Sequence, residues 1–287
     1  MKTALLLGSK FVIRSFVLSS LLFVAPVSAD FDLAILNPVP KILSVPSSLD
    51  PQKIVHFSSV SDLEIELRMV RGNLLPGRWL KVLQKHFAEA PKHFLLSGRV
   101  RPEHIQALRD LKRVQIHYLA GQSSLESSKI NMLYSIGPVQ KIVVLADNFK
   151  HDQLEAVFGI KHTFAGIQVN EDGLSADQVN WLGANQVKKK ILYLPGSVKA
   201  SFLYDLAGIR PLTLEISTQN NQLGSDILNV LKDFRGVELR LVLNGKLTID
   251  QMREFTVLDR FSLKIRLEDK METIPGLAQL LNRISPP

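Results

Sequence analysis

The chain has 287 residues, of which 46% are hydrophobic, and a formal net charge of +8 at pH 7. It contains no cysteine, which excludes disulfide bonds and an acylated lipoprotein anchor, but it is long enough to bury a large core without them. The positive charges are scattered apart from the run 188–190, and no basic surface with interleaved aromatic residues is evident, so nucleic-acid binding is not expected.

The first 29 residues have the layout of a secretory signal peptide. Its parts, in order, are the basic residues Lys2, Lys10 and Arg14, the largely apolar run 16–24, and the small-x-small cleavage site 27–29. A membrane anchor is the alternative, but this run is shorter than the roughly 20 residues that a spanning helix needs. We therefore expect an exported protein, periplasmic or extracellular, without an integral membrane segment after cleavage.

An internal repeat of about 49 residues fills the rest of the chain. Residues 30–40 are an apolar lead-in, which we expect to cover the exposed end of the repeat region. The repeat itself spans residues 41–287 in five units. Their equivalent turn residues, separated by one interval of 51 residues and three of 49, are Ser47, Gly98, Asp147, Gly196 and Gly245.

Each unit predicts the order strand, helix, strand, helix. Short apolar stretches precede the turn, and apolar residues spaced by three follow it, as Leu203, Leu206 and Ile209 do in the fourth unit. Spacing of two then marks a second strand, as at Leu212 and Leu214, before another helix. Five units therefore predict about ten strands and ten helices.

Stacked strand-helix units can form an open solenoid or a closed barrel. Ten strands are more than the eight of the common barrel. The polar residues Thr213, Glu215 and Ser217 also alternate with buried ones, whereas barrel strands usually read as continuous apolar runs. We therefore expect an α/β solenoid of horseshoe shape, with one parallel sheet and the helices on its convex side.

The spacing resembles that of the leucine-rich-repeat family. The run from Leu203 to Leu214 has that family's core pattern, and two similar runs start at Leu108 and Leu228. The resemblance covers nearly the whole chain after residue 29. The family's buried Asn or Cys ladder is missing, because its positions hold Leu119, Ser217, Val242 and Arg266. The resemblance implies a divergent repeat protein that binds another protein on its concave face.

The strand residues that point away from the helices would line this concave face. They form an apolar column and charged strips, and we expect them to bind a protein partner. The candidate residues are Leu95, Val144, Tyr193, Val242, His117, Glu215, Lys264 and Arg266. Two alternatives stay open: these residues reflect strand propensity alone, or the lead-in folds over them.

Motifs for catalysis, cofactors or metals are not found. The seven histidines have no metal-ligand spacing, and neither a phosphate-binding loop nor a serine nucleophile elbow occurs. Carboxylates do lie at strand ends, where a barrel enzyme would keep catalytic groups; they are Asp147, Glu171, Asp172, Glu268 and Asp269.

The main expectation is a non-enzymatic, exported protein-binding module without cofactor or metal. One alternative is a barrel-like hydrolase that uses the strand-end carboxylates. The other is a scaffold that self-assembles through its exposed end strands.

Overall fold

The computed structural model describes residues 40–69, 72, 74–98, 100–121, 127–135, 139–244, 249–258, 260–268 and 276–283. All of them belong to one unit that spans Leu33–Pro287. The predicted signal peptide, the lead-in before Pro40 and the turn residue Gly245 lie outside the described residues.

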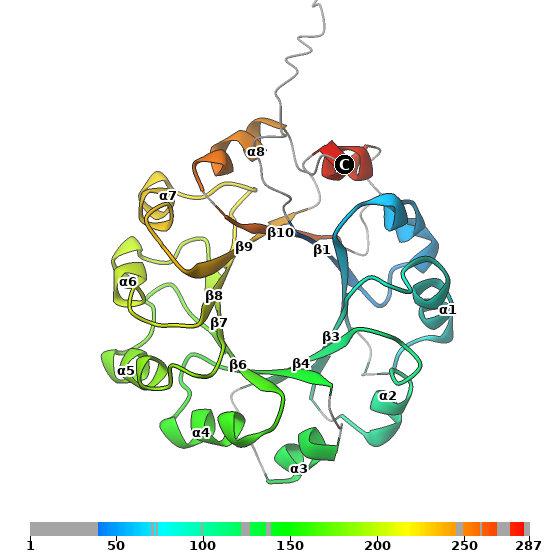
Figure 1. The fold of residues 1–287 in the computed structure, drawn as a ribbon, viewed down its shortest axis with the longest axis horizontal. Helices are drawn as coiled ribbons and strands as arrows, with labels where there is room; N and C mark the ends of the chain where they lie inside the picture. The colour runs from blue at the N-terminus through cyan, green and yellow to red at the C-terminus, as the bar shows by residue number, and fades with distance from the viewer. Residues whose placement is uncertain are drawn as a thin grey trace, which may run out of the picture. The chain divides into compact units, whose positions relative to one another are not determined.

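Ten parallel strands form a closed barrel in which each strand pairs with its neighbours in chain order (Figure 1). The strands are β1 (Lys41–Pro46), β2 (Leu63–Arg68), β3 (Lys92–Ser97), β4 (Val114–Gly121), β5 (Gln140–Leu145), β6 (Thr163–Gln168), β7 (Lys190–Pro195), β8 (Leu212–Ser217), β9 (Val237–Asn244) and β10 (Ser262–Arg266). The predicted α/β class is therefore confirmed.

Helices lie outside the ring of strands (Figure 1). They are η2 (Pro51–Ser59), α1 (Gly77–His86), α2 (Pro102–Gln106), α3 (Ser127–Ser135), α4 (His151–Gly159), α5 (Ala176–Ala184), α6 (Ala200–Asp205), α7 (Ser225–Leu231), α8 (Ile249–Glu254) with η3 (Phe255–Val257), and α9 (Leu277–Arg283). The main hydrophobic core fills the space between these helices and the outer face of the strands. The predicted apolar columns supply it, for example Leu203, Leu206 and Ile209.

Strands β1 and β10 close the barrel by pairing over four residues. Beyond that ladder, the amide of Leu263 donates to the carbonyl of Pro40 at 2.9 Å, and the amide of Leu267 donates to the carbonyl of Ser44 at 2.8 Å. The predicted open horseshoe is therefore wrong. The backbone groups of β1 and β10 hydrogen-bond to each other, so neither strand presents the free edge that self-assembly through end strands would need.

The solenoid prediction failed because both architectures share the same period and the same outward apolar columns. The solenoid and the barrel differ only in whether the inner face of the sheet is open to solvent. The polar residues on that face favoured an open one. In fact Thr213 is 0% and Glu215 is 4% exposed. A ten-stranded barrel is wider than an eight-stranded one, so its interior has room for polar side chains that pair with one another.

Four buried lysines occupy equivalent positions at the start of odd-numbered strands. They are Lys41, Lys92, Lys141 and Lys190, and each Nζ donates to nearby backbone carbonyls. Lys92, for example, reaches the carbonyl oxygens of Ala88 at 2.9 Å and Ala90 at 2.7 Å. The lysines thus satisfy carbonyl groups that would otherwise be orphaned where helices and loops lead into the strands.

Candidate functional site

The interior of the barrel gathers side chains from equivalent positions of the repeat. Because barrel strands are tilted, inward residues stack in layers, and odd and even strands supply alternate layers. Two layers matter most. The middle layer comes from even strands and consists of Glu66, His117, Gly166, Glu215 and Lys264. The upper layer lies toward the carboxyl-terminal ends and consists of Ser44, Leu95, Val144, Tyr193 and Val242.

The eight residues predicted to line a concave face all point into this interior. Five of them are buried (Val144, Val242, His117, Glu215 and Lys264), and three are half-buried (Leu95, Tyr193 and Arg266). The sequence pattern correctly assigned them to one face of the sheet. The expectation that this face is open is wrong, because closure of the barrel turns it inward. Their role in binding a protein partner stays a prediction.

A buried ammonium group bridges two carboxylates in the middle layer. The Nζ atom of Lys264 lies 2.7 Å from Oε2 of Glu66 and 2.7 Å from Oε1 of Glu215. The hydroxyl of Ser44 donates to Oε1 of Glu66 at 2.6 Å. Burial opposes ionisation of both carboxyl groups, but Lys264 outweighs it and holds their pKa values below the ordinary value. The bridge therefore places charged groups inside the barrel and joins β10 to both β2 and β8.

Arg240 extends the network toward the amino-terminal ends of the strands. Its two terminal nitrogens lie 3.1 Å from Oε2 of Glu215 and 3.2 Å from Oε1 of Glu238. Glu238 in turn pairs with Lys189 at 2.8 Å. Burial alone would lower the pKa of Arg240, but Glu215 and Glu238 raise it, so the guanidinium stays charged.

Two histidines and a glutamate form a hydrogen-bonded chain beside this network. Nε2 of His93 lies 2.7 Å from Oε2 of Glu64, and its Nδ1 lies 3.2 Å from Nε2 of His117. The same Nε2 of His117 is 3.0 Å from Oε1 of Gln115. Burial, together with nearby positive groups, lowers the pKa of His117 well below its ordinary value, so the ring is neutral at pH 7.

The opposite side of the interior is apolar. Ile142, Val144 and Ile191 form a buried cluster, against which Leu119, Phe164 and Tyr193 pack. The hydroxyl of Tyr193 is buried and has no hydrogen-bond partner among the described residues. Burial, with a smaller contribution from Glu215, raises the pKa of this phenol well above its ordinary value. The phenol is therefore a poor acid or nucleophile at neutral pH.

Two arginines lie at the carboxyl-terminal end of the interior, where barrel proteins usually carry their active or binding sites. Arg68 reaches from β2 to β10, where it donates to the carbonyl of Leu267 and pairs with Oε1 of Glu268 at 3.3 Å. Arg266, the residue before Leu267, is half-buried and contacts no hydrogen-bonding or ionic partner in the part of the chain that the structure describes. The Nε atoms of both arginines are buried without a partner.

The predicted strand-end carboxylates are mostly engaged with neighbouring loops. Asp147 accepts a bond from the side chain of Asn170 at 2.9 Å, and Glu171 accepts one from Ser197 at 2.6 Å. Asp172 pairs with Lys199 at 2.7 Å, and Glu268 pairs with Arg68. Asp269 lies outside the described residues. These contacts tie loops together at the carboxyl-terminal end and leave no isolated pair of carboxylates among them.

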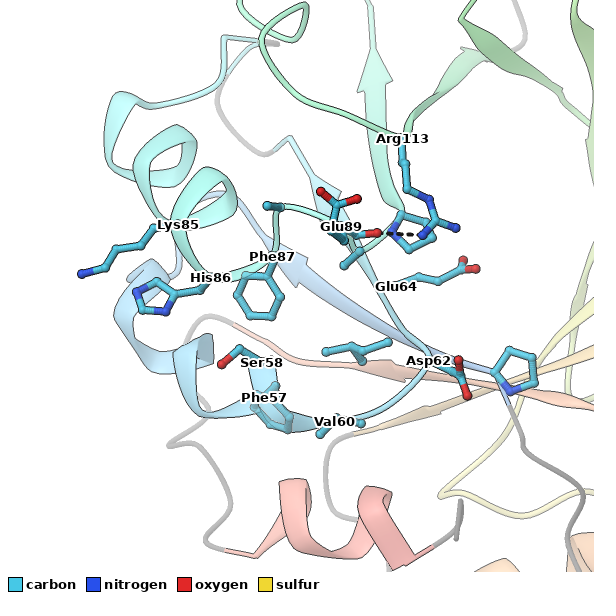
Figure 2. A pocket seen from close by; sticks show the side chains of 15 residues that line it. Phe57, Ser58, Val60, Asp62, Glu64, Lys85, His86, Phe87, Glu89 and Arg113 are labelled. Atoms are coloured by element: carbon cyan, nitrogen blue, oxygen red, sulfur yellow. Dashed lines mark hydrogen bonds between the residues drawn. The ribbon is translucent and has the colours of Figure 1, made fainter. Parts of the chain in front are cut away.

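A pocket of about 750 Å³ lies at the other end of the barrel, beside the amino-terminal ends of β2 and β3 (Figure 2). Phe57 and Phe87 contribute apolar surface to it. Asp62 and Glu64 lie on one side of the pocket, and Lys85 and His86 lie on the opposite side (Figure 2). Through Glu64, the pocket contacts the histidine chain in the barrel interior.

Sequence reasoning missed several residues of the interior site. Glu64 and Glu66 alternate with the buried residues of β2, which places them on the inner face, but this spacing does not identify Lys264 or the histidines as their partners. Arg240 and His93 precede Val242 and Leu95 by two positions, so the period-two alternation places them on the same face. The alternation therefore predicts that Arg240 and His93 point into the barrel. These side chains can pair across the barrel only because the barrel is closed. No pattern of neighbouring residues in the sequence indicates that closure.

The chain matches no model of a known protein family, and no curated protein is similar to it in sequence. Within the described ranges, no group of three or more His, Asp or Glu side chains is arranged to hold a metal ion. None of the described helices combines the length and apolar character needed to cross a bilayer.

Proposed function

We propose that the barrel binds a small organic anion with an apolar body at the carboxyl-terminal end of its strands. The main support is Arg266, whose half-buried guanidinium faces the interior without a partner among the described residues. A guanidinium matches the geometry of a carboxylate or phosphate. Because burying an unpaired charge is costly, a bound anion would stabilise this arrangement.

The neighbours of Arg266 support the same ligand class. Arg68 places a second guanidinium at the end of β10, and its partner Glu268 is more than half exposed, which weakens that ion pair. The upper layer supplies an apolar wall from Leu95, Val144 and Tyr193. An anionic head held by arginines and an apolar tail against this wall would suit the distribution of polarity.

Binding is favoured over hydrolysis. The barrel is compatible with a hydrolase, but Asp147, Glu171 and Asp172 are each bonded to neighbouring loops. A hydrolase of the kind predicted from the strand-end carboxylates would need one of them poised as a general base or nucleophile. We further propose that the protein acts after export, because the leader of residues 1–29 is typical of a signal peptide.

Calorimetric titration with octanoate tests the proposal. Arg266→Gln keeps a polar side chain but removes the charge, and we expect octanoate affinity to fall about tenfold or more, since a charged hydrogen bond contributes about 1.5–3 kcal/mol. Octanol shares the apolar tail without the charge, so its weaker binding should be the same in both proteins.

Arg109→Gln provides the matched control, because Arg109 is an exposed arginine outside the barrel and should leave octanoate binding unchanged. Octanoate that does not bind the wild-type protein, or that binds Arg266→Gln as tightly as wild type, would show that this anion site does not exist.

A further inference from the structure

The hydrogen-bonded chain of Glu64, His93 and His117 runs from solvent to the centre of the barrel. The side chain of Glu64 is 28% exposed and lines the pocket at the amino-terminal end (Figure 2), whereas His117 is only 2% exposed. His93 connects the two, with one ring nitrogen on each partner. None of these residues belongs to the proposed anion site.

The three hydrogen bonds of the chain can all form when both imidazoles are neutral. With its proton on Nε2, His93 donates to Glu64 and keeps Nδ1 free as an acceptor. The Nε2 proton of His117 then lies between that Nδ1 and the side-chain oxygen of Gln115. An added proton on Nδ1 of His93 would face the N–H of His117 across 3.2 Å. The pair can accept this proton only if His117 moves its own proton to the other ring nitrogen.

Charged groups from three strands face His117 in addition to His93. Lys264 and Arg240 carry the same charge that a protonated ring would have, and Glu215 carries the opposite charge. Glu66 faces His93 in the same way. Both carboxylates, however, already hold Lys264 between them. An imidazolium in the middle layer would therefore compete with Lys264 for Glu66 and Glu215.

We propose that Glu64, His93 and His117 form a pH switch: acid adds one proton to the histidine pair through the pocket-facing Glu64 and thereby loosens the ion network of the middle layer. The switch needs no ligand, so it stands or falls independently of the anion site.

The direction follows from proton linkage. A histidine in the unfolded chain takes up a proton near pH 6.5, whereas the folded protein holds His117 neutral to lower pH because its pKa is depressed. The stability that the neutral ring contributes is present above pH 6.5 and is lost as the pH falls toward the folded pKa. Acid therefore lowers the free energy of unfolding from about pH 6.5, below which the unfolded chain takes up the proton, down to the lower folded pKa, at which the histidine pair itself takes it up.

Guanidinium unfolding at pH 7 and pH 5 tests the switch. In wild type, we expect the folding equilibrium constant to fall by about tenfold more than in His117→Gln, because one linked proton contributes up to tenfold per pH unit. His151→Gln, at a half-exposed histidine of α4, should respond to pH as wild type does. An equal fall in wild type and His117→Gln would refute the switch.

Nitrogen-15 NMR of the imidazole rings keeps the proposal testable if His117→Gln does not fold. At pH 7.5 we expect the Nε2–H form of both rings, and on acidification the signals of the two rings should change together in one step. In Glu64→Gln, which removes the charge that stabilises an imidazolium, the joint titration should shift to lower pH. Titration of His117 alone near pH 6.5 would overturn the proposal.

Discussion

Gly166 is the smallest residue of the middle layer, and the ring of Tyr193 packs where its side chain would be. A Cβ atom at this position would lie 2.9 Å from Cε2 of Tyr193 and 3.0 Å from a methyl carbon of both Ile142 and Val144. The contact with Tyr193 is closer than real Cβ atoms tolerate, the other two are tight, and Ile142 and Val144 are themselves buried. The interior is therefore tightly packed around Gly166.

We expect Gly166→Ala to lower the free energy of unfolding by about 1–3 kcal/mol, the usual range for overpacking a buried site. Denaturant unfolding measures this change. Gly183→Ala is the matched control, because nothing lies within 4 Å of the added methyl in helix α5 and alanine favours a helix. Val144→Ala should restore part of the stability of Gly166→Ala by making room. Unaltered stability of Gly166→Ala alone would mean that Tyr193 does not occupy this space.

At the scale of the elements, the lysines that begin the odd strands show what a sequence pattern can and cannot reveal. Strands and helices followed from apolar spacing, because that spacing reports which side of an element is buried. The column Lys41, Lys92, Lys141 and Lys190 has the same period, yet lysine at a strand start usually reads as exposed. Its burial depends on carbonyl groups supplied by other segments, such as Arg210 for Lys190. Local spacing carries no information on such contacts.

Burial lowers the pKa of Lys190 to about 8, which has a consequence for stability at alkaline pH. The unfolded chain binds this proton up to about pH 10.4, so the contribution of Lys190 is fully present above that pH and is lost as the pH falls through 8. Compared with Lys190→Met, the wild-type protein should therefore gain stability from pH 8 to pH 10. Denaturant unfolding of both proteins across this range measures the difference. A stability difference that does not vary with pH would show that Lys190 titrates normally.

For the whole molecule, closure decides the function that the inner face can have. The same alternating residues would form a protein-binding surface in a horseshoe, but in the barrel they pair with one another. Lys264 meets Glu215 from a strand 49 residues earlier and Glu66 from the far end of the chain. No pattern of nearby residues distinguishes these outcomes, because the choice depends on whether β1 meets β10. The change from an open face to an enclosed interior follows from that one pairing.

Removal of residues 249–287 tests closure directly, because it deletes α8, η3, β10 and α9 and leaves β1 and β9 with unpaired edges. It also removes Lys264, so Glu66 and Glu215 lose their shared cation, and breaking a buried ion pair costs about 3–5 kcal/mol. We expect the shortened chain to lose cooperative thermal unfolding in circular dichroism and to aggregate on gel filtration. An open solenoid would behave differently, since each repeat contacts only its neighbours and loss of the elements at one end lowers stability only by the increments of those elements. A monomeric, cooperatively unfolding shortened chain would therefore contradict the closed barrel.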